Sequence, residues 1–146
     1  MRLLALACLL ALSACPSQTA TATDSDAQVA ITGARAEFDA KYQAFVARMN
    51  QYDMKIRSDG VYADLPEFQA IVAMGKAALP FVFETIAAGD FKMNEAAELI
   101  TGVDVLAPLR DDPPWGPGKP LFGEQDTSKL WLDWWAAHHN DPQWNP

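Results

Sequence analysis

The sequence predicts an all-α fold, a small single domain of four to five helices that follows an N-terminal export segment and a disordered tether. Apolar residues recur at helical spacing in several segments. No window alternates apolar and polar residues for long enough to indicate a strand. The chain has 146 residues, which leaves enough length after the export segment for one domain with one hydrophobic core.

The N-terminus has the three-part pattern of an export signal. A positive charge at Arg2 precedes an apolar run from Leu3 to Leu12, which is shorter than the roughly 20 residues needed to span a membrane. The run ends in Leu12-Ser13-Ala14-Cys15. These four residues resemble the lipobox of bacterial lipoproteins. The resemblance implies a signal peptide over 1–14, cleavage before Cys15, and acyl chains such as palmitate on that cysteine. The alternative is an ordinary secretory signal with a chance cysteine.

The lipobox resemblance also implies where in the cell the protein is located. The lipid bilayer is then a partner through acylated Cys15, and the chain is lipid-anchored in the cell envelope. Pro16 follows the cysteine, where an aspartate would signal inner-membrane retention in enteric-type bacteria. We therefore expect the periplasmic face of the outer membrane if the organism is Gram-negative. Residues 15–30 are polar and lack aromatic residues after the cysteine, which predicts a flexible tether before a helical domain over 31–146.

Composition excludes some functions. The only other cysteine, Cys8, lies in the export segment, so the mature chain has no internal disulfide. The net charge is −8 over the full sequence. An acidic chain is a poor nucleic-acid binder because contacts to phosphate need Lys and Arg.

The first predicted helix runs from about Thr32 to Arg57. Aromatic and aliphatic residues recur along it at alternating steps of four and three, which places them on one face. This stripe predicts a helix laid across its own domain, and the alternative is a coiled-coil seam to a second chain. The stripe comprises Phe38, Tyr42, Phe45, Met49, Tyr52 and Ile56.

Three shorter helices are expected in the middle of the chain. The first begins near Asp64, which has capping-box spacing to Glu67, and it ends at Gly75. The second covers residues 77–86 and ends at Gly89, and the third is capped by Asn94 and ends at Thr101-Gly102. This stretch resembles a helical hairpin of the HEAT type, in which one helix ends at a glycine and the next begins at a proline. The residues that carry the likeness are Met74-Gly75-Lys76-Ala77-Ala78-Leu79-Pro80, Glu84-Thr85-Ile86, Gly89-Asp90 and residues 96–102. A repeat array needs about three such units, and only one and a half are present.

Residues 103–125 are rich in proline and glycine and predict a long loop. The final helix is expected to begin near Asp126-Thr127. It carries Trp131, Trp134 and Trp135 at the spacing of a core face, and a platform for sugar rings is the alternative for these tryptophans. The residues expected to be buried are Phe45, Tyr52, Leu79, Phe83, Leu99, Trp131 and Trp135.

No strong catalytic motif is present, and we predict neither a catalytic residue, a cofactor nor a metal site. His138 and His139 are adjacent in a helix and diverge by about 100°, so they do not converge on one metal. Carboxylates are plentiful, but nothing in their spacing singles out a catalytic pair. Those near the predicted hairpin are Glu84, Glu95, Glu98 and Asp104.

These observations favour a membrane-tethered, non-enzymatic interaction module of the cell envelope with an envelope protein as partner. One alternative is a cell-wall-acting enzyme that uses acidic residues. Another is an immunity or inhibitor lipoprotein against a toxin or wall hydrolase. The predicted contact surface is the proline-rich loop, because tryptophan is common at interface hot spots and neighbouring acids can orient a basic partner. Its residues are Trp115, Asp111, Asp112 and Phe122. The alternative is that Trp115 folds back over the last helix and fills a gap there, with the prolines simply ending secondary structure.

Overall fold

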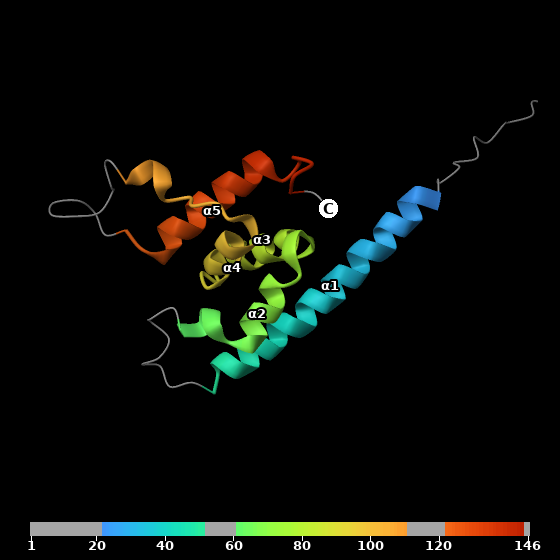
Figure 1. Ribbon diagram of the computed structural model, residues 1–146, viewed down its shortest axis with the longest axis horizontal. Helices are drawn as coiled ribbons and strands as arrows, with labels where there is room; N and C mark the ends of the chain where they lie inside the picture. Colours follow the sequence, from blue (N-terminus) through green and yellow to red (C-terminus); the bar gives the residue numbers. More distant parts are fainter. Residues whose placement is uncertain (1–21, 52–60, 111–121, 145–146) are drawn as a thin grey trace, which may run out of the picture.

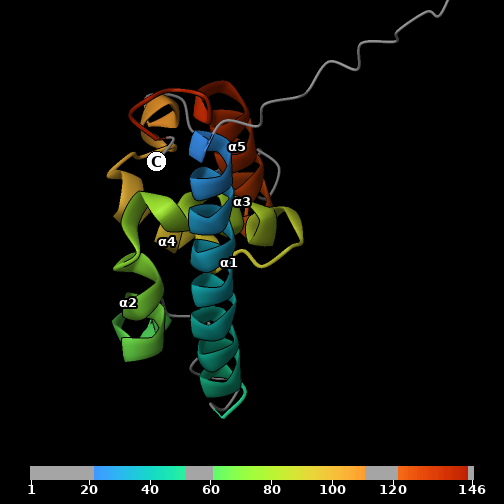
Figure 2. The same ribbon diagram turned by 90° about the vertical axis from the view of Figure 1, so that its right-hand side faces the viewer.

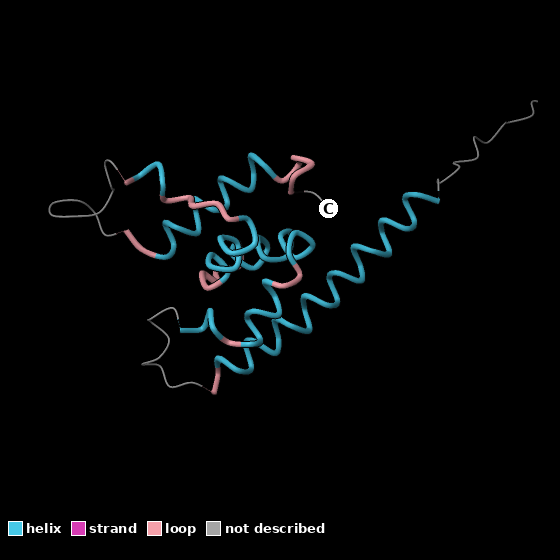
Figure 3. The backbone as a smooth tube through the Cα atoms, viewed as in Figure 1, coloured by secondary structure: helices cyan, strands magenta, loops and turns pink. Residues whose placement is uncertain are grey.

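The computed structural model describes residues 22–51, 61–110 and 122–144, and these ranges contain helices and turns but no strand (Figures 1 and 3). The all-α prediction is therefore confirmed. The α-helices are α1 (Ala22–Met49), α2 (Pro66–Val72), α3 (Leu79–Ala87), α4 (Met93–Thr101) and α5 (Glu124–His138). Short 3-10 helices add η2 (Val61–Asp64), η3 (Gly75–Ala78) and η4 (Ala107–Leu109).

Helix α1 packs on its own domain through its C-terminal half. Phe38, Phe45 and Met49 are buried and belong to the same core as α2 and α3. Tyr42 is half-buried between them, so the described members of the predicted stripe do face this domain. Tyr52 and Ile56 lie outside the described residues. The N-terminal part of α1 projects past the rest of the molecule in Figure 1, and Figure 2 shows α1 lying in front of the other helices.

The start of α1 corrects the predicted tether. The helix begins at Ala22, so the part of the expected tether from residue 22 onward is helical. The packed half of α1 supplies the nucleus, and adding further turns to an existing helix costs far less than starting one. The composition of this segment predicted flexibility, because composition does not show that a helix can extend into a segment from the packed turns that follow it.

A polar contact fixes α1 against the turn between α3 and α4. The Tyr42 hydroxyl donates a hydrogen bond to Asp90 Oδ2 at 2.8 Å, and Lys92 Nζ lies 3.0 Å from Asp90 Oδ1. Burial and the Asp90 carboxylate both raise the pKa of Tyr42, so the phenol stays protonated and remains a donor.

Helices α2 and α3 form a corner. The chain turns by 99° between α2 and the continuous η3–α3 segment, where Gly75 adopts the left-handed region with φ 61°. The resemblance to a HEAT-type hairpin implied two stacked helices, but α2 packs mainly on α1 while α3 packs on α4 and α5. Asp64 also forms no capping box, because it ends η2 and the N-cap of α2 is Leu65. Within the described residues no single helix is long and apolar enough to cross a membrane, although α2 and η3–α3 pass that test as a bent pair.

The fourth helix begins two residues earlier than predicted, because its N-cap is Lys92 and not Asn94. Asn94 lies inside α4, is 5% exposed, and hydrogen-bonds to Ser128 Oγ at 3.0 Å. It therefore ties α4 to α5 and does not cap α4. At the other end Gly102 terminates the helix with φ 68°, as the sequence predicted.

The core agrees with the prediction at four positions. Phe45, Leu79, Phe83 and Trp131 are buried. Leu99 is 47% exposed, so its predicted burial is wrong. Trp135 is half-buried against the core, and Tyr52 lies outside the described residues. Leu99 fails because α4 presents its other face to the core, through Met93, Ala96, Ala97 and Ile100.

Candidate functional site

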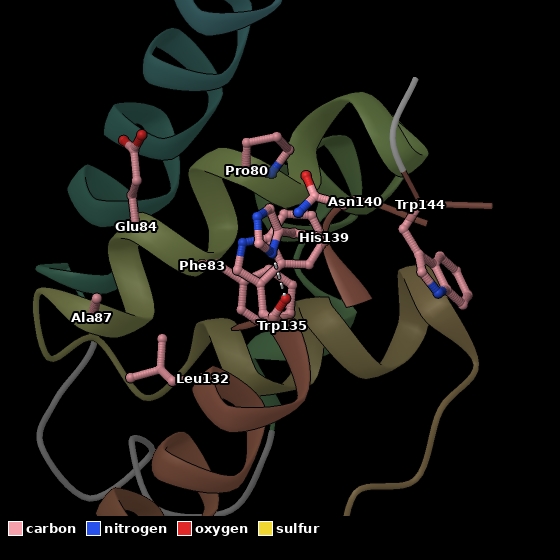
Figure 4. A pocket seen from close by; sticks show the side chains of 9 residues that line it. All are labelled: Pro80, Phe83, Glu84, Ala87, Leu132, Trp135, His139, Asn140 and Trp144. Atoms are coloured by element: carbon pink, nitrogen blue, oxygen red, sulfur yellow. Dashed lines mark hydrogen bonds between the residues drawn. The ribbon is translucent and has the colours of Figure 1, made fainter. Parts of the chain in front are cut away.

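A groove with a volume of about 480 Å³ lies between α3 and the C-terminal half of α5 (Figure 4). Residues at steps of three and four on each helix line it, because such residues share one helix face. The chain after α5 contributes three further residues, His139, Asn140 and Trp144. The lining residues are Pro80, Phe83, Glu84, Ala87, Leu132, Trp135, His139, Asn140 and Trp144.

The floor of the groove is aromatic. Phe83 stacks on Trp135 with ring centroids 4.5 Å apart and planes 9° apart. Trp134 lies behind them and meets Trp144 edge-on at 5.4 Å. The Trp-rich face of α5 thus has two parts. Trp131 is a core residue at 1% exposure, while Trp134 and Trp135 are half-buried, and Trp135 borders open space.

Three exposed polar side chains stand at the rim of the groove. Glu84 comes from α3, and His139 and Asn140 follow α5 (Figure 4). Nδ1 of His139 lies 3.2 Å from the Trp135 carbonyl oxygen, which leaves Nε2 as the available ring nitrogen. The rim therefore offers both donors and acceptors.

The Glu84 charge is balanced locally. Arg35 Nη1 lies 2.5 Å from Glu84 Oε2, and the same guanidinium contacts Asp39. The hydrogen bond to Glu84, followed by that to Asp39, raises the pKa of Arg35. Arg35 also lies over the Phe81 ring at 5.1 Å, so α1 supplies the counter-ion of the groove.

A second, acidic pocket lies at the other end of α5. It has a volume of about 210 Å³ and combines apolar side chains such as Trp131 and Leu106 with carboxylates. The sequence showed that Glu95, Glu98 and Asp104 lie near the predicted hairpin, but not that they meet. In the structure all three line this pocket. Glu84 lies apart, in the groove. The carboxylates of the acidic pocket are Glu95, Glu98, Asp104 and Glu124.

Crowding of like charges shapes the chemistry of the acidic pocket. Burial raises the pKa of Glu98, and the Glu95 and Asp104 carboxylates raise it further. Burial together with nearby carboxylates, Glu95 first among them, raises the pKa of Tyr62 to about 12. Arg110 offsets part of this charge through an ion pair with Asp104.

Neither histidine contributes to a metal site in the described part of the chain, where no group of three or more His, Cys, Asp or Glu side chains is arranged to hold a metal ion. His138 stacks on Trp134 at 4.8 Å, and its Nδ1 lies 2.7 Å from the Trp134 carbonyl oxygen. The two imidazoles interact with successive tryptophans of α5.

The contact surface predicted from the sequence falls mostly outside the described residues. Asp111, Asp112 and Trp115 lie there, as does Cys15. Phe122 is described and is half-buried just before α5. The aromatic groove was missed, although its signal is present in the sequence. Trp135 and His139 are four residues apart, on α5 and at its C-cap, and Pro80 and Glu84 are four apart on α3, but nothing in the sequence shows that these two faces meet.

Comparison of this chain with protein-family models, with curated proteins and with solved structures found no match.

Proposed function

We propose that this chain is a lipid-anchored interaction module of the bacterial cell envelope that acts by binding. The observation that carries the proposal is the open groove between α3 and α5. Its floor is aromatic and its rim is polar, which is the usual composition of a site that holds a ligand or a partner side chain. Aromatic residues of this kind also supply much of the binding energy at protein interfaces. An envelope protein is the proposed macromolecular partner.

Photo-crosslinking in cells tests the binding role. A benzophenone amino acid at Asn140 stands at the rim, and the matched control at Gln143 is exposed but does not line the groove. We expect discrete adducts with an envelope protein from position 140 and few from position 143. Absence of adducts from both positions, or equal adducts from both, would contradict the proposal.

Labelling with a palmitate analogue tests the anchor separately. The proposal rests here on Leu12-Ser13-Ala14-Cys15, whose thiolate would receive the lipid. Cys15→Ser should abolish labelling and leave uncleaved precursor, because no thioether can form. A mutant that is labelled as strongly as the wild type would remove the membrane anchor from the proposal.

The acidic pocket favours a second candidate function, a cell-wall-acting enzyme. A carboxylic acid with a raised pKa next to an ionised carboxylate is the pairing used for general-acid catalysis on glycosides. Glu98, beside Glu95 and Asp104, is the residue that fits the acid role. Release of soluble fragments from purified cell wall, lost in Glu98→Gln, would support this candidate. No release by the wild-type protein would exclude it for that substrate.

The same pocket suits the inhibitor alternative, in which a basic toxin or wall hydrolase is the partner. Carboxylates at a binding surface accelerate association with a basic protein, and this acceleration falls as salt is added. A partner recovered by crosslinking would fit this role if its association rate fell steeply with ionic strength and if Glu95→Gln slowed it. An association rate independent of salt would contradict it.

A further inference from the structure

We propose that the groove between α3 and α5 binds a neutral, hydroxyl-rich saccharide of the kind found in N-acetylated glycan strands. The proposal adds a ligand class to the groove, and only its cellular setting rests on the proposed function. It stands on three features of the groove, which are its aromatic floor, its polar rim and its balanced charge.

The floor matches the apolar side of a sugar ring. A pyranose presents several C–H groups on one face, and these carry a small positive charge that is attracted to the negative face of an aromatic ring. Trp135 is half-buried, so part of its side chain is accessible in the groove, whereas Phe83 and Trp144 line the groove but are only 2% and 8% exposed. Because Trp135 is stacked on Phe83 at 4.5 Å, its position is fixed before a ligand arrives. Less conformational entropy is then lost on binding.

The rim matches the hydroxyl groups around a sugar. Glu84 accepts hydrogen bonds, the Asn140 amide both donates and accepts them, and Nε2 of the neutral His139 ring accepts one, because its Nδ1 donates to the Trp135 carbonyl oxygen. All three side chains are exposed at the mouth of the groove, so a ligand can reach them without a rearrangement of the fold.

The charge of the groove favours a neutral ligand. Arg35 is shared between Glu84 and Asp39, and a cationic ligand would have to compete with its ion pair to Glu84. Lys76 lies over the Trp144 ring at 5.6 Å and occupies the position that a cationic ligand would take on that ring. An anionic ligand would be repelled by a chain with a net charge of −8. The volume of about 480 Å³ falls within the range of small-molecule sites, which extends from roughly 300 to 1,000 Å³.

Calorimetric titration of the full lipidated chain in nanodiscs with tri-N-acetylchitotriose tests the proposal, with empty nanodiscs as the blank. We expect saturable binding. We also expect a trisaccharide of galacturonic acid to bind at least tenfold more weakly because of its negative charge. Asn140→Ala and His139→Ala should each weaken binding of the chitotriose about tenfold, the effect of losing one hydrogen bond of roughly 1.4 kcal/mol. Gln143→Ala removes an exposed amide three residues from Asn140 and should leave affinity unchanged.

Thermal melting of each variant provides the folding control. All three variants should have the melting temperature of the wild type, because the altered side chains are exposed. Absence of binding up to about 10 mM, well above the millimolar affinity of a weak site, overturns the proposal. Equal loss in Gln143→Ala, or equal binding of the anionic trisaccharide, also overturns it. A protein crosslinked at position 140 in cells, together with no response to sugar, would reject the saccharide and leave the interaction module standing.

Discussion

The two halves of α5 belong to one helix but serve surfaces of opposite character. The C-terminal half packs aromatic rings on α3 and borders a groove whose single carboxylate, Glu84, is paired with Arg35. The N-terminal half borders a pocket in which carboxylates outnumber the cations. Trp131 lies between the two surfaces and is almost completely buried.

This difference shows how one amphipathic helix can separate two kinds of chemistry. The aromatic half gains stability from burial, so the groove is built on side chains that the fold also needs. The acidic half loses stability from burial of the Glu98 carboxyl and from repulsion by Glu95 and Asp104, and both effects raise the pKa of Glu98. Groups that are retained at a cost to stability are candidates for a functional role, which is why the acidic pocket carries the second candidate function.

The largest expected effect concerns the aromatic half. Phe83 is 2% exposed and contacts Trp131, Trp134 and Trp135. Phe83→Ala should lower the free energy of unfolding by roughly 3–5 kcal/mol, because it leaves a large cavity. Urea denaturation followed by circular dichroism measures this. Leu99→Ala is the control, and its exposed side chain should cost under about 1 kcal/mol. Equal losses for the two variants would mean that the face of α3 is wrongly assigned.

A smaller effect is expected where α4 packs against the N-terminal half of α5. The Asn94 amide donates to Ser128 Oγ at 3.0 Å, and the Ser128 hydroxyl lies 3.2 Å from Asn94 Oδ1. Asn94→Ala should cost about 1–3 kcal/mol, because it removes these bonds from a buried site. A double-mutant cycle with Ser128→Ala measures the coupling between the two side chains. Additive losses in that cycle would show that α4 and α5 are not joined through this pair.

The smallest effect has the opposite sign and concerns the acidic half. The pKa of Glu98 is raised in the folded state. Its protonated form therefore stabilises the fold fully below the unfolded-state pKa. This stabilisation is lost as pH rises through the folded-state pKa. Glu98→Gln should therefore stabilise the protein at pH 7, by less than about 1 kcal/mol because the group is largely exposed. The gain should shrink as pH falls through the raised folded-state pKa and should be gone below the usual glutamate value of 4.5, where the wild-type carboxyl is neutral in both states. Thermal melts across pH measure it, and a gain that grows toward low pH would refute the assignment.

Periodicity predicted the helices well and their ends less well. The stripe of α1 and the tryptophan spacing of α5 specify which residues are buried, because burial requires one face. Asn94 shows why a helix end is harder to predict. Asp90 Oδ1 accepts a hydrogen bond from the Lys92 amide at 3.2 Å, so the chain turns before Asn94 and the asparagine enters the helix. Both residues are good turn formers, and only tertiary packing decides between them.

The sites were harder to predict than the helices because each joins segments that are distant in sequence. The groove needs Glu84 and His139, and the acidic pocket needs Tyr62 and Glu124. The sequence predicted that a helix ends at Gly75, but no local pattern predicts the 99° turn that the chain makes there. That turn brings α3 against α5. The sequence therefore indicated three of the four pocket carboxylates, but it did not predict the pocket that they form with Glu124.

The free end of α1 has a consequence for how the protein melts. Residues 28–33 are exposed on all sides, whereas the same helix is buried in the core from Phe38 onward. About three free turns are too short to hold a helix in water without a neighbour, so they persist only as an extension of the packed turns. Amide protons should exchange with solvent along a gradient, fast near Ala22 and slow near Phe45, within a single unbroken helix. A proteinase would then shorten α1 from its free end and stop near Arg35, where the ion pair with Glu84 begins to hold the helix.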